Sequence, residues 1–322
     1  MAAPRELQWL LGLVGSMLLL MCFYQWDVSQ KKQGRIRQLQ EDRKQLLRDV
    51  CAIDKGAFPK QKYTLGDLNR KDLGNLIVDD KNGVIYCYIP KVACTNWKRV
   101  MLFLKENMTY DEIISIPGPK IHTGKNLTLL KSYPPSKIKA KLKKYTKFMF
   151  VRDPFVRLIS AYRDKFLHPN KYYQTYVQKV WSLYGNKRGR FYAKGKRKAV
   201  ASKPQPTFYN FIQYLVDPRT ERTQAYDPHW RQMYRLCHPC LIKYDFVGHQ
   251  ETLQEDAEQL FKMLQLEDDI KVPPSYENVT SSGSVEDWFR TVPLEDRRKL
   301  YKIYERDFRL FGYQRPAELL DE

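Results

Sequence analysis

Acidic residues, glycine and histidine are scarce in this sequence, and each shortage argues against certain classes of function. The chain has 322 residues, with 36 Asp and Glu against 56 Lys and Arg, 15 glycines and five histidines. It lacks a Gly-Lys-Ser/Thr loop and an obvious magnesium-binding acidic motif, which argues against a P-loop phosphoryl-transfer enzyme. The positive charge is not accompanied by any recognised nucleic-acid module, so no nucleic-acid partner is expected. The histidines are too scattered to supply the second ligand pair of a zinc site, and no metal is expected.

One stretch predicts a buried strand, a tight loop and a helix. Val84–Ile89 is β-branched and aromatic, and Pro90 closes this strand. Thr95 or Asn96 can cap the helix that follows. Lys91 lies in the loop, where backbone N–H groups, the helix dipole and its own charge together suit an oxyanion. On spacing alone, an anion site and an ordinary piece of α/β core are equal alternatives.

A second stretch repeats the pattern. Phe148–Val151 is the expected strand, Asp153 the helix N-cap and Pro154 the first helical residue. Arg152 at the strand end and Ser160 two turns into the helix are polar groups able to meet one anion. The apolar side chains that share one helical face and predict its core side are Phe155, Leu158, Ile159, Tyr162 and Phe166.

With these two stretches the chain resembles the Golgi carbohydrate sulfotransferases, most closely the chondroitin 4-O-sulfotransferase and HNK-1 sulfotransferase group. The resemblance runs from about Ile77 to the C-terminus and includes His229-Trp230, Leu236–Cys240, Tyr244–Gly248, Asp287–Phe289 and Leu310–Tyr313. It implies that the first stretch holds the 5′-phosphosulfate of 3′-phosphoadenylyl sulfate (PAPS) through Lys91, Val92, Ala93, Cys94, Thr95, Asn96 and Trp97. It also implies that the 3′-phosphate is held by Arg152, Asp153, Pro154, Phe155, Val156, Arg157, Leu158, Ile159 and Ser160.

Strands alternate with helices over residues 73–322, which predicts an α/β catalytic domain with a mostly parallel sheet. A hairpin is expected within Ile77–Ile89, turning at Lys81-Asn82-Gly83, and a further strand at Leu241–Val247. Both anion motifs lie at strand ends, where ligands bind in such sheets. The expected helices are Thr95–Glu106, Pro154–Phe166, Thr207–Val216, Thr252–Gln265 and Leu294–Phe308.

Residues 7–26 contain no charged side chain. Twenty residues can span a bilayer, and no small-x-small cleavage site precedes Asp27, which favours an uncleaved signal anchor over a cleaved signal peptide. Residues 1–6 would be a cytoplasmic tail. The flanking charges predict the opposite orientation, with the C-terminal side in the cytoplasm. One basic residue precedes the span and four follow it soon afterwards. The resemblance implies a single-pass type II protein of the Golgi membrane with a lumenal catalytic domain.

Residues 27–72 are expected to form a lumenal stem. Ile36, Leu39, Leu46 and Val50 follow a three-four spacing that could be a short coiled-coil seam, but two heptads are few, and a solvated, partly helical stalk is favoured. In a lumenal protein, three sequons give the expected glycosylation sites, which are Asn107, Asn126 and Asn278.

The excess of positive charge is concentrated in two runs without an acid. Lys131–Lys147 carries seven lysines and leads into the second anion motif, so part of it is expected to support the donor site. Asn186–Lys198 carries seven Lys and Arg. Such runs usually form a solvated surface, but this charge also suits a polyanionic glycosaminoglycan.

Cys237 and Cys240 have the C-x-x-C spacing of zinc or redox sites. In the implied lumenal location, a structural disulfide involving one or both is favoured, with its pairing left open.

The sulfuryl acceptor needs a base, and imidazole is the side chain with a pKa nearest neutrality. His122 matches a histidine at the same relative place in related sulfotransferases and is the first candidate; His229 also matches a family histidine and is the second. For each, a histidine merely hydrogen-bonded in a loop is an equal alternative. Lys91 is the third expected catalytic residue, stabilising the charge on the leaving phosphate.

The resemblance implies sulfate transfer from PAPS to O4 of N-acetylgalactosamine in chondroitin or desulfated dermatan. Terminal N-acetylgalactosamine of N-glycans and the HNK-1 glucuronate are alternative acceptors. A membrane-tethered glycosaminoglycan-binding protein without activity is a further alternative, but it leaves two anion sites without a purpose. The oligomeric state, monomer or homodimer, stays open.

Overall fold

The fold is seen in a computed structural model that describes residues 5–57, 64–106, 108–123, 127–168, 170–185, 205–267, 269–270 and 282–321. A five-stranded sheet has the order β3-β1-β2-β4-β5. Strands β2, β4 and β5 are parallel, whereas β1 is antiparallel to both β2 and β3. The α/β class is therefore confirmed, but the sheet is mixed rather than mostly parallel. The strands are β1 Leu76–Asp79, β2 Val84–Cys87, β3 Thr128–Leu129, β4 Thr146–Val151 and β5 Phe246–His249.

The expected hairpin forms between β1 and β2, with Asp79 paired to Val84. Its connection has four residues instead of the expected two-residue turn. The Asp79 carboxylate accepts hydrogen bonds from the backbone N–H groups of Lys81 and Asn82, and Gly83 has a φ of +63°, which favours glycine. This turn closes the end of β2 that lies away from Lys91.

The five expected helices are all present. Three expected strands have different limits. Strand β2 ends at Cys87 instead of Ile89, β4 begins at Thr146 instead of Phe148, and β5 begins at Phe246 instead of Leu241. The helices confirmed are α2 Cys94–Lys105, α6 Pro154–Phe166, α8 Phe208–Val216, α11 Leu253–Leu264 and α13 Leu294–Leu310. The remaining helices are α1 Arg5–Ala57, α3 Tyr110–Ser115, α4 Gly118–Thr123, α5 Pro135–Lys144, α7 Gln178–Tyr184, α9 Pro218–Thr223, α10 Met233–Cys237, α12 Ser282–Phe289 and α14 Ala317–Leu320, with short 3₁₀ or π turns at Leu65–Asp67, Leu130–Ser132, Tyr173–Val177 and Gln250–Thr252.

Two hydrophobic cores hold the molecule together. The first surrounds the sheet and includes side chains of α1, α2 and α11. Within it Trp97 of α2 stacks on Phe150 of β4 with ring centroids 4.2 Å apart. A Cβ atom on Gly248 would lie 2.1 Å from the Phe150 ring, which explains the glycine in the Tyr244–Gly248 motif. The second core is mainly aromatic and packs α6, α7, α8, α12 and α13 around the fully buried Trp230.

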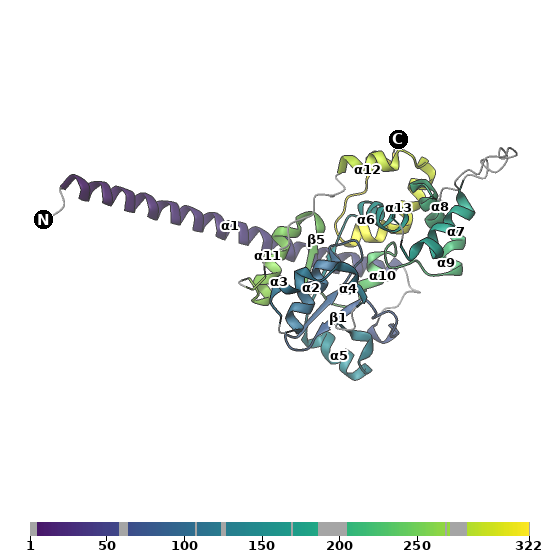
Figure 1. The fold of residues 1–322 in the computed structure, drawn as a ribbon, viewed down its shortest axis with the longest axis horizontal. Helices are drawn as coiled ribbons and strands as arrows, with labels where there is room; N and C mark the ends of the chain where they lie inside the picture. Colours follow the sequence, from purple (N-terminus) through teal and green to yellow (C-terminus); the bar gives the residue numbers. More distant parts are fainter. Residues whose placement is uncertain are drawn as a thin grey trace.

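Helix α1 extends well beyond the rest of the chain, but its C-terminal half belongs to the folded domain (Figure 1). Ile36, Leu47 and Val50 are buried. The Gln40 amide bonds both backbone groups of Val247, donating to its carbonyl at 3.1 Å and accepting from its N–H at 3.1 Å. It therefore covers part of the open edge of β5.

The expectation of a solvated stalk is wrong for this part of α1. Arg43, the residue that interrupts the three-four spacing, pairs with the buried carboxylate of Asp256 at 2.8 Å. The face that packs on the domain therefore follows the predicted spacing only in part, because Leu39 is exposed while Gln40 and Leu47 are buried. Within the described ranges, no helix combines the length and apolar character needed to cross a membrane.

Two disulfides fix the C-x-x-C segment, and each of its cysteines has a distant partner. Cys51 of α1 is bonded to Cys240, and Cys87 of β2 is bonded to Cys237. The prediction of a structural disulfide is confirmed. The three sequons at Asn107, Asn126 and Asn278 and the basic run Asn186–Lys198 lie outside the described residues.

Candidate active site

The loop between β2 and α2 has a strained backbone. Lys91 has a φ of +71° and Ala93 a φ of +46°, in a region that side-chain-bearing residues rarely adopt. Two arginines hold this conformation: Arg157 Nε donates to the Pro90 carbonyl at 3.0 Å, and Arg152 Nη1 donates to the Lys91 carbonyl at 3.2 Å. Strain that is held in place by surrounding contacts is typical of ligand-binding loops.

The loop leads directly into the N-terminus of α2. The N-cap is Ala93, without a side-chain cap, so the expected capping by Thr95 or Asn96 is wrong. Asn96 and Trp97 donate their N–H groups to the Ala93 carbonyl. The N–H groups before them precede the first bond of the helix and can bind an anion, aided by the helix dipole. Because the side chains of Val92 and Trp97 are buried, only their backbone groups can take part.

The Lys91 ammonium meets a carboxylate of helix α6. Its Nζ lies 2.8 Å from Asp164 Oδ2, and Lys165 Nζ lies 3.0 Å from the same oxygen. Burial raises the pKa of Asp164, but Lys91 and Lys165 outweigh burial and leave this pKa below its ordinary value. Two positive charges thus share one carboxylate, and the site as a whole favours an added anion.

The second motif begins as expected. The Asp153 carboxylate accepts from the N–H groups of Phe155 and Val156 at 2.8 and 2.9 Å, and Pro154 is the first residue of α6. Burial raises the pKa of Asp153 to about 6. The Asp153 N–H donates to Glu251, which also accepts from the Tyr313 hydroxyl.

The nine residues of the second motif divide by orientation. Pro154, Phe155, Leu158 and Ile159 are buried, whereas Arg152, Val156 and Ser160 are half-buried. Ser160 precedes Asp164 by one helical turn, so both lie on the α6 face that meets Lys91. The polar pair expected to bind a phosphate, Arg152 and Ser160, is therefore next to the first loop.

Arg157 has a structural role that its place in the motif does not predict. It is fully buried and donates to three carbonyls: to Pro90 at 3.0 Å, to Arg231 at 2.8 Å and to Pro228 at 2.7 Å. It therefore joins the anion loop to the segment that carries His229. Since its N–H groups point at these carbonyls, we assign Arg157 to positioning and not to phosphate binding.

His229 has the hydrogen bonds of a general base. Its Nδ1 lies 2.6 Å from Asp227 Oδ1 and 3.3 Å from the Tyr172 hydroxyl. An ionised Asp227 requires the proton on Nδ1, which leaves a lone pair on Nε2. No described residue forms a hydrogen bond with Nε2. Burial lowers the pKa of His229; Asp227 opposes this shift, while Lys165 and Lys91 add to it.

His122, on α4, is held through both ring nitrogens. Nε2 lies 2.9 Å from Thr95 Oγ1, and Nδ1 lies 3.2 Å from Lys98 Nζ. Partial removal of the ring from water, and then the charges of Lys98, Lys165 and His229, lower its pKa to about 4, although the residue as a whole is exposed. Both candidate histidines thus belong to one site, but their hydrogen bonds differ.

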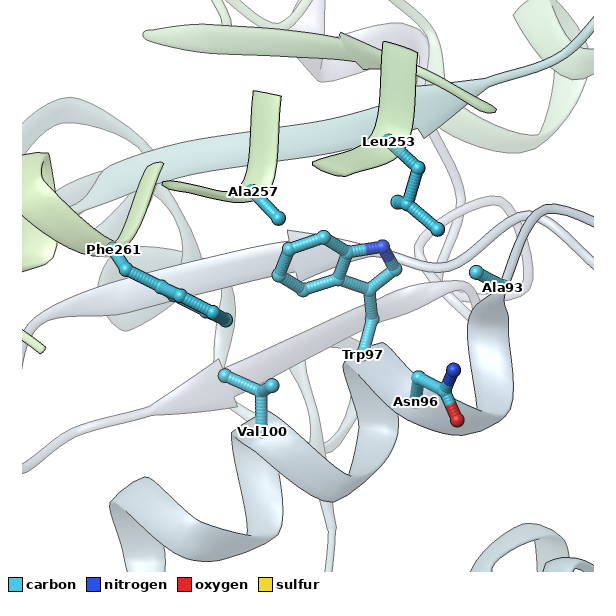
Figure 2. Close-up of a pocket in the computed structure, with 7 residues that line it drawn as sticks. All are labelled: Ala93, Asn96, Trp97, Val100, Leu253, Ala257 and Phe261. Carbon is cyan, nitrogen blue, oxygen red and sulfur yellow. The ribbon is translucent and has the colours of Figure 1, made fainter. Parts of the chain in front are cut away.

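An apolar pocket adjoins the anion loop. It lies between the start of α2 and helix α11, with the Trp97 indole at its centre (Figure 2). Trp97 Nε1 is buried and has no hydrogen-bond partner among the described residues. The pocket is lined by Ala93, Asn96, Trp97, Val100, Leu253, Ala257 and Phe261.

Two lysines of the run Lys131–Lys147 lie away from this site. Lys141 of α5 pairs with Asp80 in the β1–β2 turn, and Lys147 Nζ lies 3.0 Å from Asp245 before β5. This is the sheet end opposite the carboxyl ends of β2 and β4. Lys131 lies at the other end, since its side chain is beside Gly74, whose carbonyl accepts from the Tyr88 hydroxyl. That part of the run supports the donor site therefore stays a prediction, and Lys141 and Lys147 are not that part.

An oxyanion-binding loop and an arginine-serine pair at neighbouring strand ends indicate a transferase that uses a nucleotide donor. Comparison with known proteins identifies the family. Residues 74–314 match the model of the sulfotransferase family, and the chain belongs to this family. Its relatives carry carbohydrate sulfotransferase names, which confirms the resemblance seen in the sequence.

Three relatives illustrate the range of sequence identity. Carbohydrate sulfotransferase 12 of Mus musculus is 47% identical over 311 residues, which is 92% of this chain and 74% of the relative. Carbohydrate sulfotransferase 11 of Rattus norvegicus is 36% identical, covering 87% of this chain and 78% of the relative. Carbohydrate sulfotransferase 9 of Homo sapiens is 33% identical, covering 90% of this chain and 63% of the relative. No solved structure gives a significant match.

Several site residues were missed from the sequence. Asp164 has no distinctive local pattern, and only the fold brings it to Lys91, 73 residues earlier in the chain. Asp227 precedes His229 by two residues, which was the one available signal. Lys98 follows the anion loop within α2 and could not be distinguished from a solvated helix position.

Proposed function

We propose that this carbohydrate sulfotransferase transfers the sulfuryl group of PAPS to O4 of N-acetylgalactosamine in chondroitin or desulfated dermatan. The observation that carries the proposal is the meeting of Lys91, the α2 N-terminus and the Asp227–His229 pair around one site. The donor anion would bind where Lys91 now pairs with Asp164. The acceptor hydroxyl would face His229.

Donor binding divides between the two motifs. Backbone N–H groups at the start of α2 would hold the 5′-phosphate, and Arg152 with Ser160 would hold the 3′-phosphate. The two motifs are adjacent, as one nucleotide requires, because Arg152 Nη1 lies 3.2 Å from the Lys91 carbonyl.

Transfer needs a base and charge stabilisation. His229 Nε2 would take the proton of the acceptor O4 hydroxyl as the O4–S bond forms. The bond between sulfur and the 5′-phosphate oxygen would break, and Lys91 would neutralise the charge growing on that phosphate. Adenosine 3′,5′-bisphosphate leaves, and Asp227 stabilises the imidazolium. His122 was the first candidate for the base, but its hydrogen bonds favour exchanging the two roles.

The acceptor is tested by radiolabelled sulfate transfer to a panel of desulfated glycans, followed by disaccharide analysis. The expected product is 4-O-sulfated N-acetylgalactosamine within chondroitin or dermatan. Transfer only to terminal N-acetylgalactosamine or to glucuronate would contradict the proposed acceptor while keeping the reaction. Polymer binding without any transfer would favour the non-catalytic alternative.

We also propose that the domain lies in the Golgi lumen on a type II membrane anchor. Two disulfides support an oxidising compartment. Many apolar side chains of α1 between Leu13 and Trp26 are exposed, which supports burial in a bilayer. In sealed microsomes, the domain is expected to resist protease until detergent is added. Digestion without detergent would contradict this orientation.

A further inference from the structure

Lys98 is a buried cation without a carboxylate partner. It lies on α2, one turn after Cys94, and is only 7% exposed. Its Nζ contacts His122 Nδ1 at 3.2 Å and lies 3.9 Å from the centroid of the Tyr88 ring. Among the described residues it forms no ion pair, although a buried ammonium is normally matched by an anion. The only side chain that forms a hydrogen bond with this ammonium among the described residues is therefore the His122 imidazole.

The hydrogen-bond directions around Lys98 are fixed by chemistry. An ammonium can only donate, so His122 Nδ1 must accept and the ring proton must be on Nε2. Nε2 then donates to Thr95 Oγ1, 2.9 Å away. Because Thr95 accepts this bond, its own hydroxyl proton is free to point elsewhere. Thr95 lies in the first turn of α2, where the N–H groups also point outward.

The other groups facing His122 favour its neutral form on balance. Lys165 and Asp164 come from α6, and His229 comes from the segment before α10. Asp164 alone raises the pKa of His122, whereas partial removal from water, Lys98 and Lys165 lower it. A neutral ring is what the chain of donors requires.

We propose that Lys98, His122 and Thr95 form a one-directional hydrogen-bond chain that ends on the phosphosulfate of the donor. The buried ammonium polarises the imidazole, the imidazole polarises the hydroxyl, and the hydroxyl donates to an anionic oxygen. Lys98 is a positioning residue, since it fixes the tautomer of His122 without touching the donor. The identity of the anion rests on the proposed function; the direction of the chain does not.

The first test is ¹⁵N NMR of the histidine rings in the ligand-free protein, titrated from pH 4 to pH 8. In the wild type His122 is expected to carry its proton on Nε2 and to stay neutral down to about pH 5. In Lys98→Met, its pKa rises toward the ordinary value of about 6.5 and the tautomers mix. Lys105→Met, an exposed lysine at the other end of α2, is the matched control. A wild-type proton on Nδ1, or a His122 unchanged by Lys98→Met, would overturn the chain.

The second test measures the effect of the hydrogen-bond chain on binding of the donor. Thr95→Val removes the last hydroxyl without disturbing the buried lysine, and Thr95→Ser restores it. Donor KM is expected to rise about tenfold in Thr95→Val and in Lys98→Met, and the double variant should lose little more. Additive losses would show that the two residues act separately. If Lys98→Met does not fold, the comparison of Thr95→Val with Thr95→Ser tests the chain on its own. Equal donor KM in these two variants would contradict the chain. If NMR supports the chain and no sulfate is transferred by the wild type, the proposed function fails and the chain stands.

Discussion

Among single residues, Lys91 carries the charge on which the proposed reaction depends most. In Lys91→Ala, kcat should fall about 10²-fold or more, because charge on the leaving phosphate loses its counter-ion. Initial rates at saturating donor measure this, with Lys105→Ala as a control for removal of a helix-end lysine. Turnover within about threefold of the wild type would show that Lys91 does not stabilise the transition state.

Asp227 is the residue that distinguishes His229 from His122 as the base. Asp227→Asn removes the charge that keeps the proton on Nδ1, so kcat should fall about 10²- to 10⁴-fold. Since Asp227 raises the pKa of His229 against the effect of burial, its loss moves the acidic limb of the pH–rate profile to lower pH. In the wild type this limb should lie below the ordinary imidazole value of about 6.5. An unchanged limb in Asp227→Asn would return the role to His122.

The sequence predicted part of the site at this scale. The residues that we propose to bind the donor directly, Lys91, Arg152 and Ser160, lie in local motifs that carry the family resemblance. The residues that act on them come from distant segments: Asp164 meets Lys91 across 73 residues, and Arg157 meets Pro90 across 67. Such pairings depend on how α6 packs against the loop, which a local pattern does not contain.

At the scale of elements, α1 is the helix whose role differs most from its sequence pattern. A three-four apolar spacing is shared by coiled coils and by helices that pack on a domain, so the pattern alone could not decide between them. The partners decide it: Gln40 and Arg43 meet Val247 and Asp256, more than 200 residues later. The strand-loop-helix units, by contrast, were predicted within a few residues because strand composition, Asp153 and Pro154 are local signals.

Gln40 provides the test of this helix. Gln40→Ala leaves the Val247 N–H without its side-chain partner, while the Val247 carbonyl keeps its bond from Arg43 Nη1, so the free energy of unfolding should fall by about 1–3 kcal/mol. Chemical denaturation measures the loss. Gln38→Ala is the matched control, because Gln38 is exposed and bonds only Asp42 in its own helix. Equal stability of the two variants would mean that α1 does not close the edge of β5.

In the molecule as a whole, the site lies where the two hydrophobic cores meet. The anion loop extends from the sheet core, while α6 and Trp230, next to His229, belong to the aromatic core. Arg157 joins them through Pro90, Pro228 and Arg231. The mixed sheet order could not be predicted, because the pairing of β3 with β1 involves only two residues of each strand.

The net charge of +20 is distributed over surfaces with different roles. Converting Lys137, Lys139 and Lys143 to Gln should leave donor KM unchanged, since these exposed lysines of α5 lie at the sheet end away from Lys91. Initial rates at varied donor concentration measure this. A rise of several-fold would restore the lysine run to the donor site. If donor KM is unchanged and acceptor KM loses its dependence on salt, the lysine run binds the polyanionic acceptor.

The central claim is that two strand-end motifs form one nucleotide site that reads a 3′-phosphate. Calorimetric titration of the folded protein with adenosine 3′,5′-bisphosphate and with adenosine 5′-phosphate tests it most directly. The bisphosphate should bind more tightly by about tenfold or more, from charge-assisted bonds to one phosphate. Arg152→Ala and Ser160→Ala should each reduce this preference and leave affinity for the 5′-phosphate nucleotide nearly unchanged. Equal affinity for the two nucleotides in the wild type, or a preference unaffected by both substitutions, would contradict the assignment of the site.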